Sequence, residues 1–209
     1  MIRPEGFRAA AFGTASDGDA RNDPEARSRI SRQLDISEQW ATVSQVHGAV
    51  VAHASGPGHI GEADAIITQM AGLPITVATA DCVPLIIEAD HSAAVVHAGW
   101  RGLEAGIVEA ALDAIVATGD EPRRAAIGPA IGPCCYEVGS DVAARFPRSI
   151  TQTTWATPSV DLRRIALERL RGLEVWVSDR CTLTDAELNS HRADGTSSRQ
   201  VAVTWLPPR

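Results

Sequence analysis

Two histidines and a cysteine are the side chains of this sequence best suited to bind a metal ion: His47, Cys82 and His97. They lie 35 and 15 residues apart, and each is expected beside a turn. Such spacing excludes a local Cys-x-x-Cys finger and requires the tertiary fold to assemble the site. Two imidazoles and one thiolate would hold tetrahedral zinc with one position open for water or substrate. Judged one at a time, however, the three are more typical of hydrogen-bonded histidines and a small buried thiol.

The other cysteines of the chain are Cys134, Cys135 and Cys181. Two of them are adjacent, which matches no disulfide framework, so we expect free thiols in a reducing compartment. Cys134 and Cys135 follow a loop rich in glycine and proline. A second metal site, a nucleophile and simple packing are all open for this pair, and packing is the usual state of a free cysteine. Cys181, beside Asp179 and Arg180, is expected to be structural.

Hydrophobic periodicity and turn chemistry predict the elements that position these residues. Asp23-Pro24-Glu25 is typical of a helix start, and a helix of about ten residues should follow it. Longer periodic stretches predict a helix from Leu103 to Val116 and another that Asp161 caps. Extended patterns predict strands near 43–46, 49–52, 74–79, 83–87, 93–96, 124–127, 174–177 and 200–206. Cys82 and His97 would then lie where strands end.

The order of these elements bears on the fold class. Strands and helices mix without the strict β-α-β rhythm of a doubly wound sheet, and no glycine-rich phosphate fingerprint follows a strand. We therefore predict an α+β fold, a mixed α/β sandwich. The chain has 209 residues, of which 44% are apolar and 22% charged. Since single-core domains run to roughly 250 residues, residues 1–209 are expected to form one domain with a sizeable core.

Charge and hydropathy restrict the partners. The formal charge is −7 and the pI is near 5.3, which disfavours nucleic-acid binding. The N-terminal residues lack an apolar leader, and nowhere do about 18 apolar residues run together, so neither secretion nor membrane spanning is predicted. The sequence thus favours a cytoplasmic protein, monomer or homodimer, that acts on a small molecule.

Five short motifs favour the metal site over the interpretation of His47, Cys82 and His97 as ordinary core residues. The motifs occur in the order seen in the YfiH-like family, which the chain resembles. The motifs are Gln45–Gly48, Ala63–Thr68, Thr79–Pro84, Val96–Gly102 and Ile127–Val138. The resemblance resumes at Arg192–Gly195 and at Arg199. That family has been described both as laccase-like multicopper polyphenol oxidases and as purine nucleoside phosphorylases, and some relatives as peptidoglycan editing factors.

The resemblance implies a ligand set, a fold and an activity. Its ligand positions fall on His47, Cys82 and His97, with zinc as the metal and copper as the other candidate. The implied fold is an α/β/β/α sandwich grouped with cysteine-hydrolase-like proteins. The implied activities are phosphorolysis of adenosine, inosine, guanosine and methylthioadenosine, together with adenosine deamination.

Roles for two carboxylates follow from those activities. The catalytic set would contain Cys82, His47 and His97, and Asp81 or Asp64 would carry the proton work of deamination. Asp64 is also a candidate for substrate binding. The structural alternative is that each aspartate caps a turn or a strand.

Phosphorolysis also needs an anion pocket in an otherwise acidic protein. Arg101 is the first candidate, because it lies between two glycines before the predicted helix. Arg192 and Arg199 are further candidates. The structural alternative for Arg101 is an ion pair with Glu104, and Trp100 can either stack on a base or belong to the core.

Two departures from the family pattern bear on substrate and anion binding. The family's N-terminal Arg-x-Gly-Gly loop is not found in the matching segment, Arg8–Gly18. The usual aromatic-Arg-Arg pattern near the C-terminus is replaced by Ser190–Ala193, which keeps one arginine of the pair.

Three other functional classes compete with phosphorolysis. A copper-dependent polyphenol oxidase is the poorer alternative, because laccase chemistry needs many histidines and the chain has six. Four of them lack ligand-like grouping in sequence: His53, His59, His91 and His191. In a cysteine-type amidase editing peptidoglycan precursors, Cys82 would be the nucleophile and His97 or His47 its base. A non-catalytic binding module is the remaining class.

Overall fold

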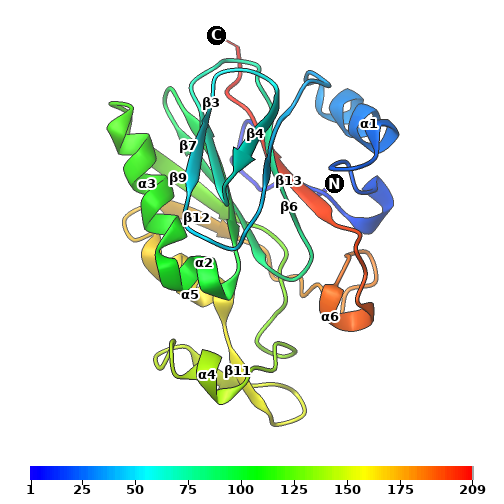
Figure 1. Ribbon diagram of the computed structural model, residues 1–209, viewed down its shortest axis with the longest axis vertical. Helices are drawn as coiled ribbons and strands as arrows, with labels where there is room; N and C mark the ends of the chain where they lie inside the picture. The colour runs from blue at the N-terminus through cyan, green and yellow to red at the C-terminus, as the bar shows by residue number, and fades with distance from the viewer. Residues whose placement is uncertain (209) are drawn as a thin grey trace.

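In the computed structural model, which describes residues 1–208, two β-sheets pack face to face and helices cover both outer sides (Figure 1). Within these residues, one sheet has the order β1 (Ala10–Phe12), β13 (Gln200–Thr204), β6 (Ile75–Thr79), β2 (Ala41–Ser44) and β4 (Gly58–Glu62). The other has the order β12 (Glu174–Val177), β9 (Pro122–Ile127), β7 (Val83–Ala89), β8 (Ala93–Ala98), β5 (Ala65–Thr68) and β3 (Val51–Ala54). A separate hairpin consists of β10 (Ile150–Gln152) and β11 (Pro158–Val160).

The helices surround this double sheet. They are the 3-10 turn η1 (Ala15–Asp17), α1 (Pro24–Leu34), α2 (Trp100–Ala105), α3 (Ile107–Ala117), α4 (Ser140–Ala143), α5 (Leu162–Arg169) and α6 (His191–Asp194). α4 and the β10–β11 hairpin project from one end of the sandwich (Figure 1). No helix among residues 1–208 is both long and apolar enough to cross a membrane.

Three apolar layers hold the sandwich together. Side chains such as Ile75 and Ile86 pack between the two sheets. Helix α1 covers the sheet that contains β6, and it buries Ile30 there. Helices α3 and α5 cover the other sheet through residues such as Ile107 and Ile165. This arrangement confirms the predicted mixed α/β fold and its α/β/β/α layering.

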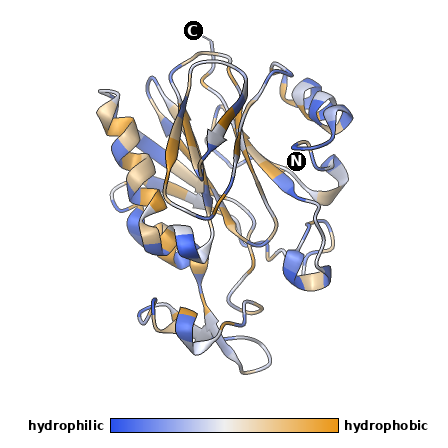
Figure 2. Ribbon diagram, in the orientation of Figure 1, coloured by the Kyte–Doolittle hydropathy of each residue, from blue (hydrophilic) through white to orange (hydrophobic). Residues whose placement is uncertain are grey.

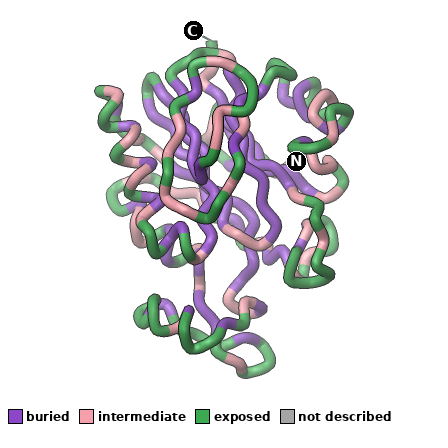
Figure 3. Tube along the Cα trace, in the orientation of Figure 1, coloured by how far each residue is buried: buried purple, intermediate pink, exposed green. Residues whose placement is uncertain are grey.

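The central strands are buried on both faces, which explains why their sequences are continuous apolar runs. Every residue of β6, β7 and β8 is buried, because each strand has a sheet or helix against both faces. Figure 2 shows the apolar colouring along these strands and along α3, and Figure 3 shows the same strands buried while the outer loops are exposed. Strand neighbours are both parallel and antiparallel, as expected for a mixed sheet.

The predicted start of α1 is confirmed. The Asp23 carboxylate accepts hydrogen bonds from the backbone N–H groups of Glu25 and Ala26, and Pro24 occupies the first helical position. Such a cap contributes about 1 kcal/mol, whereas burying one large aliphatic side chain such as Ile30 contributes about 2 kcal/mol. The cap therefore sets where the helix begins, and packing on the sheet holds it in place.

One prediction about the segment after His97 is wrong. The predicted helix from Leu103 to Val116 is two helices, because Gly106 adopts a left-handed conformation (φ 86°) between α2 and α3. His97 lies at the end of β8, as predicted, and it is paired in register with Pro84 of β7. The helix thus begins at Trp100, closer to His97 than the sequence indicated.

Candidate active site and metal centre

The turn that carries His47 is built around a buried carboxylate. After β2 ends, the backbone N–H groups of Val46, His47 and Gly48 donate to the Asp64 carboxylate at 3.3, 2.9 and 2.6 Å. His47 itself has a positive φ of 61°, which an ordinary residue adopts only when its surroundings enforce it. The side-chain amide of Gln45 fastens the start of this turn to β6 through both backbone groups of Ala78.

Neighbouring strands bring Cys82 and His97 to the same place. Cys82 lies in the tight turn between β6 and β7, and His97 lies on β8, the next strand of the sheet. A side chain at Gly99 would lie 3.0 Å from His47 Cδ2 and 3.1 Å from Cys82 Sγ. A side chain there would push on His47 and Cys82, so glycine at this position allows their close approach.

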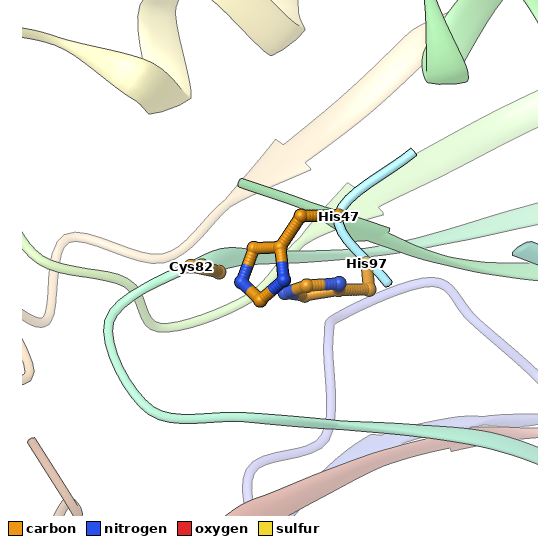
Figure 4. Close-up of side chains that lie close together, drawn as sticks. All are labelled: His47, Cys82 and His97. Carbon is orange, nitrogen blue, oxygen red and sulfur yellow. The ribbon is translucent and has the colours of Figure 1, made fainter. Parts of the chain in front are cut away.

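His47, Cys82 and His97 point toward one another from three separate segments (Figure 4). Their ligand atoms all lie within 4.8 Å of one another, and the imidazole rings meet edge to face with centroids 4.7 Å apart. His97 is buried, Cys82 is half-buried and His47 is exposed. Two imidazole nitrogens and one thiolate fit a zinc ion with one open coordination position, and the open side faces solvent.

Asp64 lies behind this group and orients it. One of its oxygens is 2.8 Å from His97 Nδ1, and the residue is fully buried. A carboxylate on one imidazole nitrogen leaves the other free to bind a metal, as is usual for metal-binding histidines. Burial raises the pKa of Asp64, but the hydrogen bonds from His97 and from the N–H groups of Gly48 and His47 outweigh it and keep the pKa below its usual value.

The cysteine and His97 influence each other's protonation in the metal-free protein. Burial raises the pKa of the Cys82 thiol, but its contacts with His47 and His97 outweigh this effect and lower the pKa to about 6. Burial lowers the pKa of His97, yet Asp64 and Cys82 raise it to about 9. Near neutral pH the pair is therefore a thiolate beside an imidazolium.

The site lies in a cleft of about 900 Å³, a volume that suits a nucleoside-sized ligand. Besides His47, Cys82 and His97, the lining of the cleft contains basic side chains and one carboxylate, that of Asp81. The basic side chains are Arg21, His59, His191, Arg192 and Arg199. The cleft is thus positively charged in a protein whose net charge is −7, and a concave site of one sign attracts the opposite charge.

The structure separates the predicted polar residues into two sets. Arg192 and Asp81 line the cleft, whereas Arg101 and Asp64 are not among its lining residues. Arg101 is exposed on α2, with its guanidinium 4.3 Å from the Trp100 ring. The predicted alternative partner of Arg101, Glu104, pairs instead with Arg145. His97 and the His47 turn enclose the Asp64 carboxylate, which places it to orient these residues.

Asp81 anchors a distant segment to the Cys82 turn. Its carboxylate accepts hydrogen bonds from the hydroxyls of Thr182 and Ser190 at 2.6 and 2.7 Å, and from the backbone N–H of Arg192 at 2.7 Å. Asp81 has a positive φ of 84°, which turns its side chain toward that segment. These contacts hold Arg192 in the cleft wall and occupy the oxygens that the predicted proton transfer would use.

Two cleft residues occurred in the sequence motifs without being given a role. Burial raises the pKa of Tyr136 to about 12, so its hydroxyl stays protonated and can donate a hydrogen bond. The Thr79 hydroxyl is buried and has no hydrogen-bond partner among residues 1–208. Tyr136 ends the Cys-Cys-Tyr run, and Thr79 begins the Thr-Ala-Asp-Cys run. These positions in the motifs are the sequence signal that could have identified the two residues.

A second group of sulfur atoms lies on the loops that form one wall of the cleft. Cys134 Sγ is 3.1 Å from Cys135 Sγ and 3.8 Å from Cys181 Sγ, and the three sulfurs lie within 4.8 Å of one another. Cys181 is thus not isolated, as the sequence suggested, because a bridge between it and Ala130 joins the two loops. Burial and the neighbouring thiols raise the pKa of Cys135.

Comparison with known proteins identifies similar chains. Residues 3–207 match the family described as "Multi-copper polyphenol oxidoreductase laccase". The "Purine nucleoside phosphorylase ORF3" of Streptomyces griseus is 38% identical, over 96% of this chain and 90% of that one. The "Purine nucleoside phosphorylase" of Deinococcus radiodurans is 37% identical, over 99% of this chain and 88% of that one.

Solved structures share the fold. YlmD from Geobacillus stearothermophilus has a TM-score of 0.81 and 28% identity, with coverage of 91% of this chain and 82% of that one. The Bacillus licheniformis hypothetical protein YfiH has a TM-score of 0.84 and 21% identity, with coverage of 94% and 92%. At 21% identity, the similarity to the Bacillus licheniformis protein concerns the fold alone.

Proposed function

The chain belongs to the multi-copper polyphenol oxidoreductase laccase family, the YfiH-like family, and from that premise we propose that it is a zinc-dependent purine nucleoside phosphorylase. The observation that carries the proposal is the open group of His47, Cys82 and His97 at a cationic cleft. The names of the relatives support purine nucleosides as substrates. Adenosine, inosine, guanosine and methylthioadenosine are the proposed substrates, with adenosine deamination as a second reaction.

The proposed zinc ligands are the imidazoles of His47 and His97 and the thiolate of Cys82. When bound there, zinc would supply a Lewis acid beside the substrate. Asp64 fixes the ring orientation of His97 and the shape of the His47 turn, so the donors are arranged before the metal arrives. Copper is the alternative metal, because imidazole and thiolate ligands also suit copper.

Arginines of the cleft are proposed to hold phosphate. The Arg192 guanidinium donates to the backbone carbonyl of Glu137, and that of Arg199 to the carbonyls of Thr196 and Ser198. Neither guanidinium pairs with a carboxylate among residues 1–208, so both keep donors and charge available to an anion. Arg21 is a weaker candidate because Asp19 already neutralises it.

The nucleoside would lie between these arginines and the zinc ligands. A phosphate oxygen attacks C1′ of the ribose, the bond from C1′ to the purine nitrogen breaks, and the base leaves with the bonding electron pair. The leaving base needs a hydrogen-bond donor, and the Tyr136 hydroxyl is the proposed one because its raised pKa keeps it protonated. Thr79 Oγ1 offers a further buried hydroxyl to the ligand.

The test is incubation of the zinc-loaded protein with inosine, with and without phosphate. Release of hypoxanthine and ribose 1-phosphate only when phosphate is present is the expected result. Absence of product from a zinc-loaded sample across the four nucleosides would refute the proposal. Oxygen consumption with a phenol by copper-loaded protein would support the polyphenol oxidase alternative.

Matched arginine variants test the anion pocket. Arg192→Ala should raise the KM for phosphate by about 10-fold, because a hydrogen bond to a charged group contributes about 1.5 kcal/mol or more. Arg101→Ala is the control, since it removes the same charged side chain from outside the cleft lining. An equal change in both variants would contradict the assignment of Arg192.

A cysteine hydrolase is the second candidate, and one specific observation favours it. Without metal, Cys82, His97 and Asp64 form a thiolate, an imidazolium and an orienting carboxylate, the arrangement of a nucleophile with its base. Such an enzyme would cleave an amide bond, as in the editing of peptidoglycan precursors, and it would do so without a bound metal. Hydrolysis that survives chelation and is lost on alkylation of Cys82 would support this function over phosphorolysis.

A further inference from the structure

The three-thiol cluster of Cys134, Cys135 and Cys181 plays no part in the proposed reaction. It joins two loops, since Ala130 and Cys181 pair as a bridge and Thr182 N–H donates to the Ala130 carbonyl at 3.2 Å. Two of its three residues are buried, and Cys134 is half-buried. An ion could therefore enter past Cys134 and be enclosed by sulfur.

One of the sulfur spacings matches an ion held between the thiols. Two sulfurs that each lie about 2.3 Å from a common ion are about 3.8 Å apart in tetrahedral and about 4.0 Å apart in trigonal coordination, close to the 3.8 Å between Cys134 Sγ and Cys181 Sγ. A disulfide would require about 2.05 Å. The Cys134–Cys135 separation of 3.1 Å is shorter than the ion would impose, and rotation of one thiol about its Cα–Cβ bond opens it.

The surroundings of Cys181 favour negative charge on its sulfur. The Gly132 N–H donates to Cys181 Sγ at 3.1 Å. A side chain at Gly132 would lie 3.1 Å from both Cys134 Sγ and Arg163 Nη2, so the guanidinium borders the same small space as the thiols. Arg163 is fixed there by the carbonyls of Ser178 and Arg180. A fixed cation and a backbone donor beside a thiol favour its thiolate, here that of Cys181.

We propose that Cys134, Cys135 and Cys181 form a second metal site that binds one monovalent copper ion through three thiolates. The donors are all sulfur, the set that selects the softest ions. The group has three members within residues 1–208, whereas zinc held by thiolates in a structural site takes four protein ligands. On binding, three S–H bonds lose their protons to solvent and three Cu–S bonds form, with no change in oxidation state.

Copper in this cluster would stiffen one wall of the cleft. Tyr136 follows the cluster directly, and Thr182 links it to Asp81 at the Cys82 turn. The site does not depend on the proposed phosphorolysis, because none of its ligands lines the cleft.

The sequence allows a clean experiment, because the chain has four cysteines and Cys82→Ser leaves only those of the cluster. Reduced C82S protein is titrated under nitrogen with Cu(I), supplied as its acetonitrile complex, against a chromophoric Cu(I) chelator. The matched variant is C82S/C135S, with melting temperature and near-ultraviolet circular dichroism recorded to establish that it folds. X-ray absorption of the copper-loaded C82S protein reports the donor atoms.

The expected result is one Cu(I) per C82S chain with three sulfur donors, and affinity lowered by on the order of 100-fold or more in folded C82S/C135S. C82S/C181S provides a second variant should the first fail to fold. Equal Cu(I) binding by C82S and the double variants would overturn the proposal. So would tighter binding of Zn²⁺ than of Cu(I), or a Cys134–Cys181 disulfide detected as a mass loss in protein that refuses Cu(I).

Discussion

The two sulfur-containing groups of this protein use the same amino acid in opposite ways. Cys82 shares its site with two imidazoles, opens to a cleft and is positioned by strands. Cys135 shares its site with two thiols, is buried and lies on loops. Both thiols are desolvated, yet the pKa of Cys82 is lowered and that of Cys135 is raised.

Burial raises the pKa of both thiols, so the neighbours decide why the two pKa values move in opposite directions. Imidazolium beside Cys82 stabilises the thiolate, whereas one thiolate near Cys135 discourages a second. Mixed nitrogen and sulfur donors with an open side suit a catalytic ion, and an enclosed set of sulfurs suits an ion that is held for structure. Substitution and alkylation of residues in the two groups test this division between a catalytic and a structural ion.

The largest effect is expected from removing a single cysteine ligand from each group in turn. Cys82→Ser should lower zinc affinity at the cleft site by on the order of 1000-fold, more than the 10–100-fold typical of losing an outer partner. Cys181→Ser should lower Cu(I) affinity while zinc affinity at the cleft site changes by less than about 5-fold. Competition with chromophoric chelators measures both, and a Cys181→Ser variant that loses zinc as well would show that the two groups are one site.

The carboxylate behind His97 should have the next largest effect. Asp64→Asn replaces an acceptor of hydrogen bonds from His97, His47 and Gly48 with an amide that can accept at only one of its two positions. We expect a loss of zinc affinity of about 10- to 100-fold and little change in Cu(I) binding at the cysteine cluster. Unchanged zinc affinity in folded protein would remove Asp64 from the site.

Alkylation of the metal-free protein distinguishes the thiols by pH. Since the pKa of Cys82 is about 6, its thiolate is present above that pH, and reactivity should fall as the pH drops through about 6. At pH 7 Cys82 should react with iodoacetamide roughly 30-fold faster than an ordinary cysteine. Cys135 should stay unmodified, and peptide mass spectrometry reads both. A Cys82 rate that rises only above pH 8 would contradict the imidazole contacts.

The smallest effect is expected from the hydrogen bond that links the two groups. Thr182→Val removes the hydroxyl that donates to Asp81 and should lower the free energy of unfolding by about 1 kcal/mol. Ser190 and the Arg192 N–H still donate to Asp81, so zinc affinity should change by less than about 5-fold. Guanidinium unfolding and zinc titration are the measurements. A larger change in zinc affinity would mean that the loops and the cleft site act as one unit.

The sequence predicted the elements whose signals are local. The start of α1, the cap of α5 by Asp161 and the apolar strands β6 to β8 follow from turn chemistry and hydrophobic runs. The mixed sandwich and the family membership were also predicted, and both are confirmed. The break of the long helix was missed because Gly106 is only a weak breaker in a helical pattern.

Features that depend on distant contacts were beyond the sequence. Nothing near Asp64 indicates that its carboxylate is enclosed by the His47 turn, and nothing near Cys181 indicates that Cys134 and Cys135 lie beside it. Arg101 sits in a motif rich in glycine, yet its guanidinium stacks on Trp100 outside the cleft lining. The ligand assignment of His47, Cys82 and His97 stays a prediction, although the structure brings the three together.

The place of β13 between β1 and β6 has a consequence for how the chain folds. β6 leads into the Cys82 turn, and its antiparallel partner β13 is the last strand among residues 1–208. Such non-local pairing is slow because a long loop must close before its contacts form. During synthesis the turn that carries Cys82 would thus lack one of its supporting strands until residues 200–204 have emerged from the ribosome. Metal capture at the cleft should be a late event, and a nascent chain halted before Gln200 should not retain zinc.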